Sequence, residues 1–294
     1  MDIIKAPLTD QQKPLHDIRT RNFFILDDRL DDGVLRNALD RLIRDHWRKL
    51  GARLVQRPQD GLLEYHLPRT FGEKYMLFDW SSQEYDHSIE KIPSFPKATP
   101  VEKGITLLPH LRSVESWFRP VDWPLNRKSE RPDAPLLYVH ISLFSDATVV
   151  AFSCPHVVMD QFGMSNIIKA MLGLVKGDAP PPMIGLENDV LDIGKSYKEY
   201  QRDEVVRKGR MRVRRRMEYP FVLLGFLPEL IMHSKEDSFT LFFPRPMAEA
   251  LREKHSKTLT DKYGSDPGLT NGDIVSSTLL KVWFPPKYTT VNAH

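Results

Sequence analysis

The sequence predicts a mixed α/β fold, and three observations lead to that prediction. Short runs of β-type residues alternate along the chain with segments of helical spacing. Two such runs, residues 136–144 and 148–154, flank the polar turn 145–147, which is typical of a hairpin. A helical pattern begins at about residue 161, so a short loop joins the hairpin to a helix.

Length and composition favour a soluble chain with two domains. The chain has 294 residues, 41% of them hydrophobic, and a net charge of only +3, which does not indicate a nucleic-acid binder. One cysteine excludes an intrachain disulfide and a cysteine-rich metal site, and we expect no metal. There is no signal-peptide pattern and no apolar run near the roughly 20 residues that span a bilayer. We therefore expect a cytoplasmic protein without a transmembrane segment.

The N-terminal part contains a strand, a helix and a hairpin. Residues 23–26 form a hydrophobic run, and residues 34–50 place four apolar side chains on one helical face: Leu35, Leu39, Leu42 and Ile43. Asp31 and Asp32 precede that helix and can cap it. Residues 54–65 alternate loosely and break at a turn, 58–61, which predicts a second hairpin.

The middle of the chain continues through two proline-rich loops, residues 93–100 and 120–135, into the hairpin described above. In the helix that follows, an apolar stripe is expected from Phe162, Ile167, Ile168, Met171, Leu172 and Val175. Gly177 is a plausible C-cap, and the prolines at 180–182 end this unit.

The C-terminal part begins with a basic segment, residues 207–216, expected to be helical, and an apolar run, residues 221–227. A strand at 239–243 and helices at 247–257 and 273–282 follow. We predict an N-terminal domain over residues 1–183, a crossover over 184–236, and the start of a second domain over 237–294.

The candidate functional motif is H-x-x-x-D, from His156 to Asp160, between the hairpin and the helix. An imidazole titrates near neutrality and suits removal of a proton from a hydroxyl or amine. Asp160, at the helix start, can cap the helix and hold the loop. A satisfied histidine at a strand end is the alternative interpretation of His156.

Three segments resemble the BAHD acyltransferase family, particularly its fungal members. They are residues 136–171 around the motif, residues 47–54 (Trp-Arg-Lys-Leu-Gly-Ala-Arg-Leu), and Thr270-Asn271-Gly272-Asp273, which is similar to the family's STND segment. The chain departs from the family by placing Gln161 after the motif aspartate, with Gly163 two residues later. It also lacks the family's D-F-G-W-G motif and has about two thirds of the family's length, so we expect a truncated member.

The resemblance implies a chloramphenicol-acetyltransferase-like architecture of two α/β domains, the first complete and the second partly present. It implies acyl transfer from acyl-CoA to a small-molecule alcohol or amine, without a permanently bound cofactor, in secondary metabolism. His156 would be the general base, Asp160 and Gly163 would support the motif, and Thr270, Asn271 and Asp273 would be channel residues of the second domain. Self-association through the incomplete second domain is a further expectation.

Several alternatives remain open. A condensation-type domain using a carrier-protein thioester usually has a second histidine before the motif, where this chain has Pro155. An inactive binding protein that keeps the first domain is another alternative. Cys154 could form a nucleophile pair with His156, although a small buried core residue is the simpler interpretation. The basic residues from Arg207 to Arg216 could be a solvated face, a contact for CoA phosphates or a membrane-surface hook.

Overall fold

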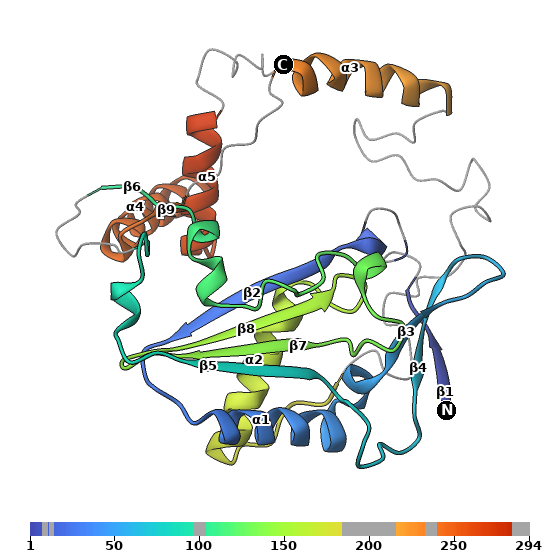
Figure 1. The fold of residues 1–294 in the computed structure, drawn as a ribbon. Helices are drawn as coiled ribbons and strands as arrows, with labels where there is room; N and C mark the ends of the chain where they lie inside the picture. The colour runs from blue at the N-terminus through green and yellow to red at the C-terminus, as the bar shows by residue number, and fades with distance from the viewer. Residues whose placement is uncertain (8–10, 12–14, 97–103, 184–215, 233–239, 284–294) are drawn as a thin grey trace. The chain divides into compact units, whose positions relative to one another are not determined.

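The computed structural model describes residues 1–7, 11, 15–96, 104–183, 216–232 and 240–283. These residues form two compact units. Unit 1 comprises Met1–Ile92 and Glu115–Ser234, and unit 2 comprises Pro93–Val114 and Lys235–His294. The predicted mixed α/β fold is confirmed, because sheets and helices alternate along the chain (Figure 1).

The central feature of unit 1 is a four-stranded sheet in the order β2-β8-β7-β5 (Figure 1). Its strands are β2 (Arg19–Leu26), β8 (Thr148–Pro155), β7 (Tyr138–Leu143) and β5 (Asp79–Glu84). Neighbours run antiparallel, except that β5 is parallel to β7. The predicted β7–β8 hairpin is confirmed, whereas β5, with its polar sequence, was not predicted.

The end of β8 corrects one expectation. The predicted strand ended at Cys154, whereas β8 continues through Pro155, which lies opposite Arg19. Because proline lacks only the N–H donor, it can close a strand without disturbing the ladder before it. The strand therefore delivers the chain directly to His156.

Helices α1 (Asp32–Arg41) and α2 (Gln161–Lys176) pack on one face of this sheet (Figure 1). The predicted single helix 34–50 is wrong in its second half. After α1 the chain continues as a π-helical turn, η3 (Leu42–His46), and a 3-10 turn, η4 (Arg48–Gly51). The Trp47 backbone N–H donates to the Leu42 carbonyl five residues back, which ends the α-helical pattern.

Side chains of α1, α2 and the sheet form the main core. The four apolar residues predicted for the first helical face are all buried: Leu35, Leu39, Leu42 and Ile43. Asp31 is the N-cap of α1 and accepts a hydrogen bond from the Val34 N–H at 2.8 Å. Gly177 caps α2 with a positive φ of 90°, as predicted.

The predicted stripe of α2 needs two corrections. Phe162 is 81% exposed and Val175 is 43% exposed. The buried stripe instead consists of Met164, Ile167, Ile168, Ala170, Met171 and Leu174. At 100° per residue Phe162 is out of phase with these positions, so it faces away from the core.

A smaller sheet has the order β1-β4-β3, with strands β1 (Asp2–Lys5), β4 (Leu63–Leu67) and β3 (Arg53–Gln56). The predicted hairpin turn between β3 and β4 is confirmed.

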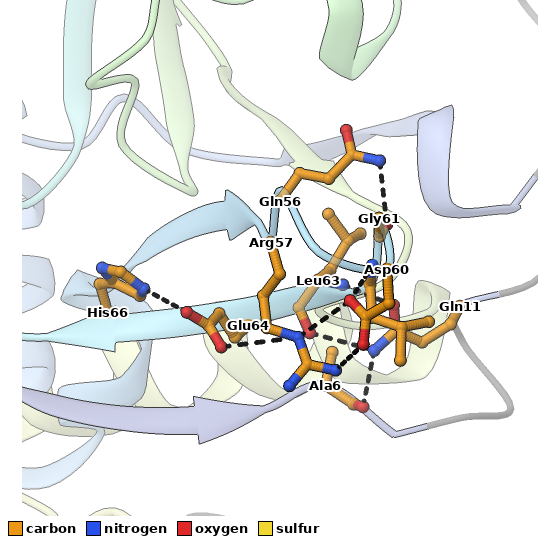
Figure 2. Close-up of polar contacts among 10 residues, drawn as sticks. Ala6, Gln11, Gln56, Arg57, Asp60, Gly61, Leu63, Glu64 and His66 are labelled. Atoms are coloured by element: carbon orange, nitrogen blue, oxygen red, sulfur yellow. Dashed lines mark hydrogen bonds and ion pairs between the residues drawn. The ribbon is translucent and has the colours of Figure 1, made fainter.

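Polar contacts at the tip of this hairpin fix its turn and register (Figure 2). Arg57 contacts Asp60 through its Nε at 3.1 Å and approaches Glu64, whose carboxylate lies 2.7 Å from the His66 ring. Gln11 donates to the Ala6 and Leu63 carbonyls and accepts from the Leu63 N–H. Because strand register is set by such turn contacts, they hold β1 and β3 on β4.

Unit 2 contains β6 (Thr106–Leu108), β9 (Thr240–Phe242), α4 (Arg245–Tyr263) and α5 (Asn271–Trp283). The predicted C-terminal strand and helices are thus present, with α4 longer than expected. β6 pairs with β9 in an antiparallel ribbon. Segment 93–114 therefore belongs with the C-terminal residues, a feature that the predicted domain boundaries do not contain.

The remaining helices include α3 (Tyr219–Met232), which follows the short turn η10 (Arg216–Glu218). The predicted basic helix lies outside the described residues, apart from Arg216. Further 3-10 turns are η2 (Leu15–Asp17), η5 (Ile89–Lys91), η6 (Leu111–Ser113), η7 (Glu115–Trp117) and η8 (Arg127–Ser129). In the described parts of the chain, no helix is both long and apolar enough to cross a membrane.

Candidate active site

The candidate base, His156, is the first residue after β8. Its backbone N–H donates to the Ile18 carbonyl at 2.8 Å, just before β2 begins. The side chain is partly buried, and within the described residues no hydrogen bond to the imidazole is present. The imidazole is therefore carried on an anchored backbone.

The loop after His156 is held at two further points. The Tyr65 hydroxyl donates to the Val157 carbonyl at 3.0 Å, and the Val158 N–H donates to the Pro155 carbonyl at 2.9 Å. Tyr65 and Val157 are both buried. The smaller sheet thus braces the loop that carries the motif.

Asp160 is the N-cap of α2. Its carboxylate accepts a hydrogen bond from the Gly163 N–H at 2.9 Å, and its carbonyl accepts one from the Met164 N–H at 3.1 Å. Among the described residues no ion pair involves Asp160. The carboxylate is therefore directed at the helix terminus, where a negative charge is also favoured by the helix dipole.

Gly163 lies where a side chain would collide with the loop. A Cβ atom there would come within 2.7 Å of the Met159 Cβ. The neighbouring atom belongs to the base of the Met159 side chain, which moves only with the backbone. This close approach gives a steric reason for glycine two residues after Gln161.

A buried arginine, Arg19, joins the end of β8 to its surroundings, and sequence reasoning missed it. Its side chain is fully buried and donates to the Ser153 side-chain and backbone oxygens and to the Leu136 carbonyl at 2.9–3.1 Å. It also pairs with Glu130 and lies 4.5 Å from the Tyr138 ring centroid. The hydrophobic run predicted here begins only at residue 23, so Arg19 was not predicted to lie in a strand.

The electrostatics around Arg19 are those of a desolvated ion pair. Burial raises the pKa of Glu130, and the Arg19 guanidinium opposes that shift. Arg19 is adjacent to Ile18, which holds His156, and it bonds Ser153, three residues before His156. The pair therefore fixes both strands that meet at the candidate base.

Cys154 is fully buried, and desolvation raises the pKa of its thiol to about 12. A thiol with such a pKa is neutral at physiological pH and is a poor nucleophile. This disfavours a Cys154–His156 nucleophile pair. Ser153 is also buried, and its hydroxyl oxygen accepts a hydrogen bond from the Arg19 side chain.

A cavity of about 560 Å³ lies on the helix side of the motif loop. Its lining includes Trp47, Val158, Met159 and Ile167, and His156 is not part of it. The Trp47 indole N–H donates to the Pro181 carbonyl at 2.8 Å and so holds the chain after α2 over the cavity. Two segments singled out in the sequence, 47–54 and the motif, thus meet at this cavity.

The predicted second-domain residues form the start of α5. The Thr270 hydroxyl and N–H donate to the Asp273 carboxylate at 2.7 and 2.8 Å, and Thr270 Oγ1 accepts from the Asp273 N–H. These hydrogen bonds lower the pKa of Asp273. Asn271 Oδ1 is buried without a hydrogen-bond partner among the described residues. A channel role for these residues stays a prediction, because they lie in unit 2 and His156 lies in unit 1.

In the described parts of the chain, no cluster of three or more His, Cys, Asp and Glu side chains could hold a metal ion.

No family model matches the chain. Acetyltransferase adrJ of Penicillium rubens is 30% identical over 278 residues, which cover 89% of this chain and 52% of that protein. Transcriptional regulator sdnM of Sordaria araneosa is 36% identical over 179 residues, 56% of this chain and 34% of that protein. The chain spans about half the length of the curated relatives it matches.

Among solved structures, F. sporotrichioides TRI101 complexed with coenzyme A and T-2 is similar to 61% of this chain. The match covers 40% of that protein, with a TM-score of 0.42 and 14% sequence identity. Several relatives by sequence are named acetyltransferase or O-acyltransferase. The names of the relatives are thus of two kinds, acyltransferase and transcriptional regulator.

Proposed function

We propose that this chain transfers an acyl group from acyl-CoA to a hydroxyl or amine of a small-molecule acceptor, with His156 as the general base. The observation that carries the proposal is the anchored backbone of His156 at the end of β8, between the strand and helix α2. Its relatives' names support acyl transfer as the reaction type.

In the proposed reaction, His156 first accepts a proton from the acceptor and later gives a proton to the leaving thiolate. His156 removes the proton from the acceptor, whose oxygen or nitrogen attacks the thioester carbonyl. The carbon–sulfur bond then breaks, and the CoA thiolate leaves with the proton from the imidazolium. General-base help of this kind is typically worth roughly 100- to 10,000-fold in rate.

Release of free CoA from acetyl-CoA, measured with a panel of alcohols and amines, tests the proposal. We expect His156→Ala to lower kcat by about 100-fold or more while the melting temperature stays at the wild-type value. Cys154→Ala is the matched control two residues away and should retain activity. An active wild type whose His156→Ala variant keeps more than about a tenth of kcat would contradict the assignment.

The variant Asp160→Ala distinguishes a structural role of Asp160 in holding the motif loop from a direct role in the reaction. Removing an N-cap carboxylate lowers the free energy of unfolding by about 0.5–2 kcal/mol. This variant should therefore have a lower melting temperature and lose activity in proportion. Asp160→Asn can still accept from the Gly163 N–H and should recover most of both. Vanishing activity with an unchanged melt would instead place Asp160 in the reaction.

The alternative that the acyl donor is a carrier-protein thioester predicts a different experimental result. If acyl transfer occurred only from a phosphopantetheinyl carrier protein and not from acyl-CoA, the condensation-type alternative would hold. Pro155, in the position where such domains usually have a second histidine, favours the acyl-CoA donor.

A further inference from the structure

The cavity of about 560 Å³ beside the motif loop is bounded on one side by helix α2. The cavity-facing positions of α2 recur at helical spacing and are 163, 166, 167, 170 and 173. Three of these five residues are small, namely Gly163, Ala170 and Gly173. Because small side chains leave the helix surface shallow, this face of α2 does not fill the space in front of it.

A second wall of the cavity is the chain that follows α2, residues 178–183, with prolines at 180–182. Proline has a fixed φ and no backbone N–H, so these three residues form a stiff wall without N–H donors. The Trp47 indole N–H donates to the Pro181 carbonyl at 2.8 Å, so this donor is already occupied. The wall therefore presents mainly apolar surface to the cavity.

The size and lining of the cavity define the chemistry of its ligand. Small-molecule sites typically measure about 300–1,000 Å³ and combine a mainly apolar lining with a few polar groups. The amide and charged side chains in this lining are Asn166, Lys169 and Asp178, and all three are exposed. Lys169 and Asp178 carry opposite charges, so the lining has no net charge. A charged ligand would lose hydration without gaining a net counter-charge, which favours an uncharged ligand.

The cavity is separate from the candidate base but contacts its loop. His156 does not line the cavity, whereas Val158 and Met159, two and three residues later, do. An occupant therefore packs against the motif loop without lying against His156. A site in this position is distinct from the place where an acceptor would give its proton to the imidazole.

We propose that this cavity binds an uncharged amphiphilic small molecule, with an apolar body and a hydroxyl or carbonyl group at one end. The apolar body packs against Trp47, Met159 and Ile167, and the polar end faces the exposed side chains of Asn166, Lys169 and Asp178. Binding of this molecule does not depend on the proposed acyl transfer.

Quenching of tryptophan fluorescence by 12-bromododecan-1-ol tests the proposal in the 294-residue chain. Bromine quenches an indole that it contacts, and Trp47 lines the cavity. We expect saturable quenching at concentrations below those at which the alcohol aggregates. The carboxylate and ammonium analogues, 12-bromododecanoate and 12-bromododecylammonium, have the same chain with a charged end. Each should bind on the order of tenfold more weakly than the alcohol.

A variant that fills the cavity locates the binding site. A Cβ at position 173 lies 3.7 Å from the Asp178 Cβ, an ordinary contact, so Gly173→Leu should fold and should abolish the quenching. Val175→Leu is the matched control, because Val175 lies on α2 but does not line the cavity, and it should bind as the wild type does. Trp47→Phe should also remove the quenching, since it removes the indole at the site.

Three results would overturn the proposal. They are the absence of saturable quenching in the wild type, quenching that Gly173→Leu or Trp47→Phe retains, and binding of either charged analogue as tight as that of the alcohol. The comparison of the three probes uses only the wild type, so it decides the charge of the ligand even where a variant does not fold. No outcome depends on activity, so a failure of the proposed function would leave this test unchanged.

Discussion

Replacing Gly163 by alanine tests whether the start of α2 is shaped by the motif loop. Glycine to alanine inside a helix normally stabilises a protein by about 0.4–1 kcal/mol, through helix propensity and the entropy of the unfolded chain. At Gly163 the new methyl group would lie 2.7 Å from the Met159 Cβ. Overpacking of this kind costs about 1–3 kcal/mol, so we expect a net loss of roughly 1–2 kcal/mol.

Gly173→Ala is the matched control in the same helix. Its Cβ would lie 3.7 Å from the Asp178 Cβ, an ordinary van der Waals contact. This variant should be stabilised by about 0.5–1 kcal/mol, so the two substitutions should differ by about 2 kcal/mol or more.

Urea unfolding at equilibrium, with thermal melting as a second measurement, gives both values. A change of 1 kcal/mol corresponds to roughly 2–4 °C in Tm for a domain of 150–250 residues. If both variants were stabilised equally, the Gly163 backbone would have room for a side chain, and the steric account of the motif loop would be refuted. Activity should fall only in Gly163→Ala, because Met159 belongs to the loop that follows His156.

Two further predictions concern buried polar groups. Arg19→Met should destabilise the chain by about 3–5 kcal/mol in urea unfolding, because it leaves the Glu130 carboxylate buried without its partner. Adding Glu130→Gln should recover part of that loss. A double variant no more stable than Arg19→Met alone would argue against the buried ion pair. Burial lowers the pKa of His140 from 6.5 to about 4, and its Nδ1 lies 2.8 Å from the Ser81 hydroxyl. The unfolded chain therefore binds more protons between these values, so stability should fall as the pH drops from about 6.5 to about 4, and His140→Gln should flatten that dependence in pH-resolved melts.

The elements that the sequence predicts well are those with strong local patterns. Helix α2, the β7–β8 hairpin and the caps at Asp31 and Gly177 follow from apolar spacing and capping chemistry, which act within a few residues. The position of His156 between strand and helix is predictable for the same reason.

The features that escaped prediction depend on contacts between distant residues. Strand β5 is polar except for Trp80, and it is a strand only because β7 lies beside it. Arg19 is buried because Glu130 and Leu136, more than a hundred residues away, supply its acceptors. The π-helical turn after α1 likewise has no periodic signature, because Leu42 and Ile43 remain buried through it.

The pairing of β6 with β9 means that the backbone passes between the two units three times, after residues 92, 114 and 234. A chain cut at residue 183 would therefore keep β6 and lose its partner strand, leaving unpaired N–H and C=O groups that invite pairing with other chains. An isolated first unit is better obtained by replacing segment 93–114 with a short flexible link and ending after α2.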